Sequence, residues 1–217
     1  MARGLEYLHV DADPPIIHQD VKSENILLCV HRGSGRQAGG RLLAKVADFG
    51  TARYAPDLLK KTHHSTRHVV GTSCYMPLEY LQSGHVSEKT DAYAFGVVLL
   101  ELLTGEEPAD SATGDMLTQR LHAPLQDAAR ELPRLLDASA GEWPLPQAVA
   151  VGGVASRCIE VIAMERCDVH DVLPTLDDAA GRQPRQYSGR NAMFDPMTGE
   201  LVPSGRSARK SSQVQVR

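Results

Sequence analysis

The sequence predicts an α+β fold in which helices predominate. Short apolar runs around polar turns between Ile16 and Gly50 favour a few β-strands, whereas longer apolar segments with helix start and stop signals fill Ser87–Ala180. The chain has 217 residues and 42% hydrophobic content, which suffices for one domain with a core. We therefore expect a domain over residues 1–180 and a tail over residues 181–217.

The N-terminal part of the chain predicts a helix end, a β-hairpin and a loop. Apolar residues three apart in Ala2–His9 predict the end of a helix, which the following prolines terminate. Ile16–Val30 predicts two short strands around a polar loop, and the Gly- and Arg-rich run 31–41 predicts a flexible connection to a further strand over residues 42–50. Residues 51–75 show no sustained periodicity and predict a long loop.

The strongest helix signal lies between Ser87 and Gly105. Ser87 is suited to cap the first turn, and Gly105 follows the last apolar residue as a stop signal. The run between them is apolar nearly all round, so we expect this helix to be buried. Further helices are predicted around Met116–Leu125, over Pro146–Val161 and over Val169–Ala179.

Composition and charge argue against several classes of protein. The net charge of −4 gives no indication of a nucleic-acid partner. The longest apolar run, Ala92–Leu100, is far shorter than the ~20 residues of a membrane span, and the N-terminus lacks the apolar region of a signal peptide. Four cysteines without C-x-x-C spacing favour free thiols in a reducing compartment. We expect a cytoplasmic chain, although a longer parent protein could be attached to a membrane.

The tail, residues 181–217, differs in composition from the rest of the chain. It carries seven Arg or Lys residues against only Asp195 and Glu200. Its low apolar content predicts disorder. A solvated linker, a contact with an acidic partner and a contact with an anionic membrane are all compatible with this composition.

A set of polar residues between two apolar anchors carries the functional signal. Asp20, Lys22 and Asn25 occur in the run IIHQDVKSENILL, and Asp48-Phe49-Gly50 follows after one predicted hairpin. Together with the runs VVGTSCYMPLEY and KTDAYAFGVVLLELLTG, these motifs resemble the large, C-terminal lobe of a eukaryotic protein kinase. The details look most like the tyrosine-kinase-like group, which holds plant receptor-like kinases and Pelle/interleukin-receptor-associated kinases. Four motifs in the same order make coincidence untenable.

The resemblance implies a serine/threonine protein kinase that transfers the γ-phosphate of ATP to hydroxyls of a protein substrate. Such a transfer depends on positioning and charge neutralisation. By the resemblance, Asp20 accepts or orients the substrate hydroxyl proton, and Lys22 contacts the γ-phosphate. Asn25 and Asp48 would hold Mg²⁺ through oxygen ligands, and Leu27 would form part of the floor under the adenine.

Further matched positions have structural or regulatory roles in the resemblance. Phe49 is expected to pack on His18, which Asp91 anchors, and Glu79 is expected to pair with Arg166 and fix the substrate-binding segment. Thr72, together with the lysine of the catalytic motif, is the serine/threonine pattern. The full set comprises His18, Phe49, Gly50, Arg53, Thr72, Glu79, Asp91 and Arg166, with Thr62, Ser65 and Thr66 as candidate phosphoacceptors.

Three features of the sequence depart from the family pattern. Gln19 stands where the family has an Arg that holds a phosphorylated residue of the activation loop, so we expect such phosphorylation to matter less here, unless Arg53 takes over that role. Cys167 stands where a Pro usually follows Arg166, and the usual Ala-Pro-Glu is Pro-Leu-Glu, ending at Glu79.

The small lobe of a kinase is not found in the sequence. Neither a Gly-rich loop nor a strand lysine precedes the catalytic motif. We therefore expect an incomplete kinase domain, a fragment rather than a free-standing lobe, that is inactive on its own. The alternative is a catalytically inactive, kinase-like interaction module. The sequence leaves open the protein substrate, the upstream activator and the oligomeric state.

Overall fold

The fold is arranged around one buried helix, α4, Glu88–Thr104. The computed structural model describes residues 1–31, 41–55, 73–181, 192–195 and 200–203. Ser87 caps α4 through its side chain, which accepts a hydrogen bond from the backbone of Lys89. The helix ends at Gly105, whose left-handed φ of 69° an L side chain rarely adopts. The predicted start, end and burial of this helix are therefore confirmed.

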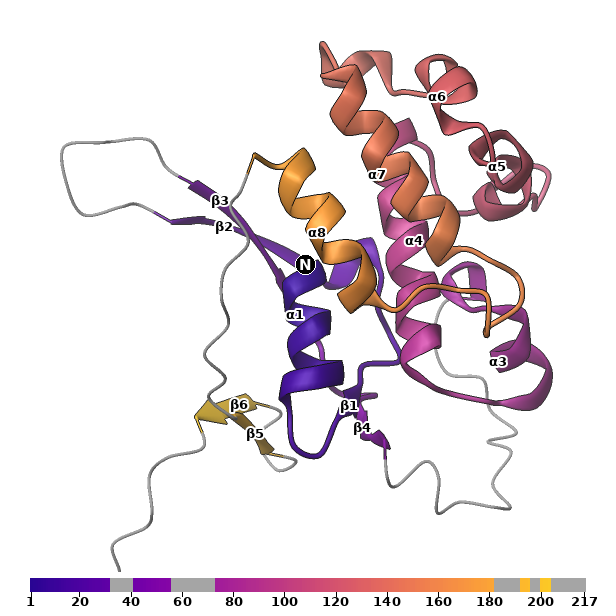
Figure 1. Ribbon diagram of the computed structural model, residues 1–217. Helices are drawn as coiled ribbons and strands as arrows, with labels where there is room; N and C mark the ends of the chain where they lie inside the picture. The colour runs from indigo at the N-terminus through magenta and orange to yellow at the C-terminus, as the bar shows by residue number, and fades with distance from the viewer. Residues whose placement is uncertain (32–40, 56–72, 182–191, 196–199, 204–217) are drawn as a thin grey trace, which may run out of the picture.

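Helices from the second half of the chain cover α4 (Figure 1). The nearest is α7, Leu145–Cys158, which packs along α4 because Gly96 leaves room for close approach. A Cβ atom at Gly96 would lie 2.7 Å from the Cβ of Cys158. Next to α7 lies α8, Val169–Ala179, which also packs on α1, Ala2–Glu6. The remaining helices are α3, Leu78–Ser83, α5, Leu117–Leu125, and α6, Ala128–Glu131.

The strands form antiparallel pairs, two of them in the N-terminal part. After α1 and a π-helical turn, Tyr7–Asp11, strand β1, Ile16–Ile17, pairs with β4, Arg53–Tyr54. Strand β2, Ile26–His31, pairs with β3, Arg41–Val46, as the predicted hairpin requires.

Several short elements correct the sequence prediction. The predicted long loop, 51–75, contains β4 and ends in a 3₁₀ turn, Ser73–Tyr75, while residues 56–72 lie outside the described part. The helices α3 and α6 were not predicted, because too few residues in them face the core to show a helical period. The same holds for the 3₁₀ turns Leu132–Arg134 and Ala138–Ala140.

The predicted tail also contains regular structure. Strand β5, Ala192–Asp195, pairs antiparallel with β6, Glu200–Pro203. The prediction of disorder was therefore wrong for these two strands, where cross-strand hydrogen bonds offset the low apolar content of the segment. The rest of the tail lies outside the described residues.

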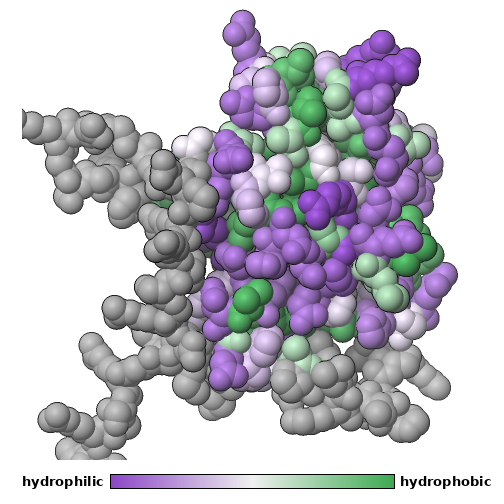
Figure 2. Space-filling model, viewed as in Figure 1, coloured by the Kyte–Doolittle hydropathy of each residue, from purple (hydrophilic) through white to green (hydrophobic). Residues whose placement is uncertain are grey.

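Apolar side chains are exposed on the β2–β3 hairpin, which projects away from the helices (Figure 1). Leu28 and Val30 are each 64% exposed, and Leu42 is 58% exposed. Elsewhere, the face in Figure 2 is mostly hydrophilic, with apolar residues in separate small patches. Among the described residues, we find no helix with the length and apolar character that a membrane crossing requires.

Candidate active site

Asp20, Lys22 and Asn25 form one hydrogen-bonded cluster between β1 and β2. The Nζ atom of Lys22 lies 2.9 Å from Oδ2 of Asp20. The side-chain amide of Asn25 donates to the same Oδ2 at 3.0 Å and to the backbone carbonyl of Asp20 at 2.8 Å. A 3₁₀ turn, Ser23–Asn25, makes this possible because it curls the chain back within five residues.

The cluster keeps Lys22 charged. Its hydrogen bond to Asp20 raises the pKa of the Lys22 ammonium group, and the negative charges of Asp20, Glu24 and Asp48 act in the same direction against partial burial. Lys22 is thus a fixed positive charge beside the carboxylate of Asp20.

Asp91 on α4 anchors residues 18–25, the candidate catalytic loop. Its two carboxylate oxygens accept the backbone N–H groups of His18 at 2.7 Å and of Gln19 at 2.8 Å. The ring of His9 lies 2.9 Å from the same carboxylate, whose residue is only 1% exposed. Gln19 has a φ of 68°, a left-handed conformation that costs a non-glycine residue about 1–3 kcal/mol. The two hydrogen bonds that Asp91 accepts offset that strain.

His18 joins the catalytic loop to the turn after β3. The backbone N–H of Asp20 donates to Nδ1 of His18 at 3.3 Å, so Nε2 carries the proton and donates to the carbonyl of Ala47 at 3.1 Å. The ring of Phe49 meets the ring of His18 edge to face, with centroids 5.0 Å apart. The hydroxyl of Thr51 donates to the carbonyl of His18 at 3.0 Å.

Asp48 and Asn25 offer oxygen ligands that fit a hard divalent cation. The backbone N–H of Ala47 donates to the carbonyl of Asn25 at 2.9 Å, which brings the turn beside the catalytic loop. Asp48 is exposed, and its left-handed φ of 63° is supported by a hydrogen bond from the N–H of Gly50 to its carboxylate. Because the amide nitrogen of Asn25 points at Asp20, its amide oxygen points away and remains available.

The other predicted positions are distributed around this cluster. Leu27 lies on β2 opposite Lys45 and is 54% exposed. Arg53 lies on β4, and its guanidinium donates to the carbonyl of Ala52 at 2.8 Å. The predicted positions that lie outside the described residues are Thr62, Ser65, Thr66 and Thr72.

A partly buried network beside the catalytic loop was not predicted. The hydroxyl of Tyr75 donates to Oε1 of Glu101 at 2.8 Å, and Oγ of Ser23 lies 3.0 Å from that hydroxyl and donates to the same carboxylate at 3.2 Å. Burial raises the pKa of Glu101, although the hydrogen bonds from Tyr75 and Ser23 oppose that shift. The available signal was Glu101 itself, an acidic residue within the apolar run VVLLELL.

The raised pKa of Glu101 leads to a pH-dependent prediction for Glu101→Gln. A folded-state pKa above the ordinary 4.5 means that the folded protein binds the proton more tightly than the unfolded chain. The wild-type free energy of unfolding therefore loses this contribution as the pH rises from 4.5 through the raised value. Glutamine does not titrate, so the stability of the variant relative to the wild type will rise over that window. Urea unfolding of both proteins across a pH series measures this difference in stability. A difference that does not change with pH would contradict the prediction.

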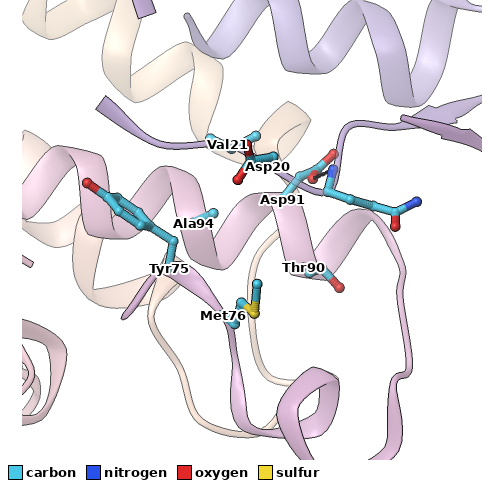
Figure 3. Close-up of a pocket in the computed structure, with 8 residues that line it drawn as sticks. Asp20, Val21, Tyr75, Met76, Thr90, Asp91 and Ala94 are labelled. Atoms are coloured by element: carbon cyan, nitrogen blue, oxygen red, sulfur yellow. Dashed lines mark hydrogen bonds between the residues drawn. The ribbon is translucent and has the colours of Figure 1, made fainter. Parts of the chain in front are cut away.

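A small cleft separates the catalytic loop from the segment after residue 72. Figure 3 shows Asp20 and Val21 on one side of the first turns of α4, with Tyr75 and Met76 on the other side. The space has a volume of about 250 Å³, including its opening to solvent. The lining residues are Gln19, Asp20, Val21, Tyr75, Met76, Thr90, Asp91 and Ala94.

Glu79 on α3 forms an ion pair with Arg166. The guanidinium donates to both carboxylate oxygens, at 2.7 and 3.4 Å, and to the carbonyls of Lys89 at 2.9 Å and Glu160 at 2.8 Å. It also lies 5.0 Å from the ring centre of Tyr93. The Arg166 side chain is 0% exposed and that of Glu79 is 21% exposed, so the pair fixes α3 onto the helical body.

The comparisons with known proteins agree with this geometry. Residues 1–174 match the protein kinase domain family. The chain is 38% identical to the proline-rich receptor-like protein kinase PERK8 of Arabidopsis thaliana. The match covers 89% of this chain and 28% of PERK8. The chain is also 37% identical to the Arabidopsis serine/threonine-protein kinase PBL27 over 97% of its length, covering 37% of that protein.

A third Arabidopsis relative is named as a tyrosine-protein kinase. The PTI1-like tyrosine-protein kinase 2 is 38% identical over 81% of the chain, which covers 45% of that protein. The chain therefore spans less than half the length of each of these curated relatives.

Proposed function

Because the chain belongs to the protein kinase family, we propose that, in its parent protein, it transfers the γ-phosphate of ATP to serine or threonine hydroxyls of a protein. The observation that carries this proposal is the cluster in which Lys22 and Asn25 both bind Oδ2 of Asp20. The presence of Asp20, Lys22 and Asn25 together in this cluster argues against an inactive interaction module.

Each side chain of the cluster has a separate task. Asp20 accepts or orients the proton of the substrate hydroxyl, and its position is set by the backbone that Asp91 holds. Lys22 places a positive charge where negative charge develops on the transferred phosphoryl group. Kinase domains use ATP with a divalent metal; we assign Mg²⁺ to Asn25 and Asp48, where it would neutralise phosphate charge when bound.

The hydroxyl preference follows from the catalytic motif. Lys22 lies two residues after Asp20, as in the serine/threonine pattern, and the name of the relative PBL27 states the same class. Phosphoamino-acid analysis of products from a full-length kinase reconstituted around these residues tests the assignment. We expect phosphoserine or phosphothreonine, and phosphotyrosine as the main product would overturn the preference.

The domain organisation is part of the proposal. Residues 1–180 would form the large lobe, and 181–217 would form a basic segment outside the catalytic domain. The exposed apolar residues Leu27, Leu28 and Val30 on β2 support packing of this hairpin against another part of the parent protein.

The activation loop leads to a further prediction. Replacing Thr62, Ser65 and Thr66 together by Ala will leave the reconstituted kinase within about tenfold of its wild-type rate. The reason is that Gln19 cannot form the charge-assisted pair with a phosphate that an Arg would form. A radiolabelled transfer assay measures the rates.

A matched variant makes this prediction specific. In a Gln19→Arg background, the same triple substitution should lower the rate more than it does in the wild type. A hundredfold loss with Gln19 intact would show that Arg53 or another cation receives the phosphate.

A further inference from the structure

Two cysteine thiols lie side by side where α7 ends and α8 begins. Cys158 is the last residue of α7, and Cys167 immediately precedes Asp168, the N-cap of α8. Their sulfur atoms are 3.4 Å apart, and the residues are 0% and 6% exposed. We propose that Cys158 and Cys167 form a site of reversible oxidation, at which a peroxide converts the two thiols into an intrachain disulfide.

The backbone already holds the two residues in a geometry that suits a bond. The N–H of Cys167 donates to the carbonyl of Arg157 at 3.2 Å, so the two segments run next to each other at this point. A disulfide has an S–S length of about 2.0 Å, so the two sulfur atoms, now 3.4 Å apart, need to approach each other by about 1.4 Å. Rotation about the side-chain torsions supplies a movement of this size without displacing a helix.

The surroundings prevent the two thiols from moving apart. The Cβ of Cys158 faces Gly96 on α4, where even a Cβ atom would be too close. On the other side, Arg166 directly precedes Cys167. The guanidinium of Arg166 donates to the carbonyls of Glu160 and Val161, which holds this part of the backbone in place. The two cysteines therefore stay next to each other in the folded chain.

The surroundings of the two cysteines differ, and this difference assigns one as the attacking thiol and the other as the resolving thiol. A hydrogen bond from Cys158 lowers the pKa of Cys167, and the positive charges of Arg157 and Lys89 contribute in the same direction. The same hydrogen bond and burial raise the pKa of Cys158. Cys167 is also the more exposed of the two residues, at 6% against 0% for Cys158. We therefore assign Cys167 as the thiolate that meets the peroxide first and Cys158 as the thiol that resolves the product.

The oxidation balances in two steps. The Cys167 thiolate attacks one oxygen of hydrogen peroxide, the O–O bond breaks, and hydroxide leaves, so that Cys167 becomes a sulfenic acid. The sulfur of Cys158 then attacks the sulfur of the sulfenic acid. The S–S bond forms, the S–O bond breaks, and water leaves with the proton of Cys158. Two thiols lose two electrons in total, and the peroxide gains them.

The sequence around the cysteines makes the product easy to identify. Trypsin cleaves after Arg157 and Arg166, so Cys158 and Cys167 fall in the separate peptides 158–166 and 167–182. The full chain is treated with hydrogen peroxide under native conditions, blocked with an alkylating reagent and digested without reduction. We expect these two peptides to be joined, with the loss of two hydrogen atoms, and a reductant to separate them.

The other two cysteines are matched controls in the same digest. Cys74 is buried, and Cys29 is partly exposed, and each lies in a further tryptic peptide. We expect both to remain alkylated at peroxide concentrations that join the pair. The proposal is overturned if Cys158 and Cys167 are alkylated as fully as Cys74, or if they link to other cysteines as often as to each other.

Single substitutions test which cysteine reacts first with the peroxide, because neither variant can form the disulfide. In Cys158→Ala, the sulfenic acid of Cys167 cannot be resolved and should be trapped by a dimedone reagent. In Cys167→Ala, Cys158 should stay unlabelled. Equal labelling of the two variants would overturn the assignment, and thermal unfolding of each variant verifies that it is folded. Oxidised wild type should also unfold at a higher urea concentration than reduced wild type, because the bridge restricts the unfolded chain.

Discussion

Replacing Arg166 by Met will lower the free energy of unfolding by about 3–5 kcal/mol, because it breaks a buried ion pair from one side. The guanidinium donates hydrogen bonds to the carboxylate of Glu79 and to the carbonyls of Lys89 and Glu160. Methionine fills much of the volume but leaves these acceptors without their donor. Each buried acceptor left without a partner costs about 1–3 kcal/mol.

Urea unfolding of the 217-residue chain measures the loss. Arg134→Met is the matched control, since Arg134 is 76% exposed and its contact with Glu131 is long, at 3.9 Å. The control should change stability by less than about 1 kcal/mol. Glu79→Gln combined with Arg166→Met should recover part of the loss, because no unpaired charge then remains. Equal effects of the Arg166 and Arg134 substitutions would contradict the structural role.

Replacing Asp20 by Asn will lower the rate of phosphoryl transfer by the reconstituted kinase about 10²–10⁴-fold, the range expected when a general base is lost. The fold should survive, because Asn25 still donates to the backbone carbonyl of residue 20 and Asp91 still holds the loop. The substitution removes the carboxylate, which pairs with Lys22 and which we propose as the acceptor of the substrate hydroxyl proton.

Transfer of radiolabelled γ-phosphate to a protein substrate measures this effect. Asp178→Asn makes the same chemical change at an exposed position on α8 and should leave the rate unchanged. Thermal unfolding of both variants separates loss of chemistry from loss of structure. A rate for Asp20→Asn within tenfold of the wild type would show that Asp20 is not the base.

Elements with strong local signals were predictable from the sequence. The helix α4 has a capping Ser87 and a terminal Gly105, and both act within one turn of the helix ends. The hairpin β2–β3 follows from two apolar runs joined by a Gly-rich segment. The cluster of Asp20, Lys22 and Asn25 is equally local, since one short turn brings its members together.

Short elements escaped prediction for a physical reason. A helix such as α3, Leu78–Ser83, has too few residues to show a periodic apolar face, and isolated helices of that length are not stable in water. Its position depends on the Glu79–Arg166 pair instead. The strand β4 exists because Arg53 and Tyr54 meet Ile17 and Ile16, residues far away in the sequence.

Patterns in the sequence were enough to predict the class of fold, the buried central helix and the candidate catalytic side chains. Which groups from distant parts of the chain contact these elements became clear only from the folded arrangement. Tyr75 reaches Glu101, and Cys158 lies against Cys167, because the packing of helices brings these segments together. A carboxylate such as Glu101 is equally compatible, in sequence, with solvent or with a buried partner. Side-chain burial and long-range hydrogen bonds depend on how helices pack, and that packing is a property of the whole chain.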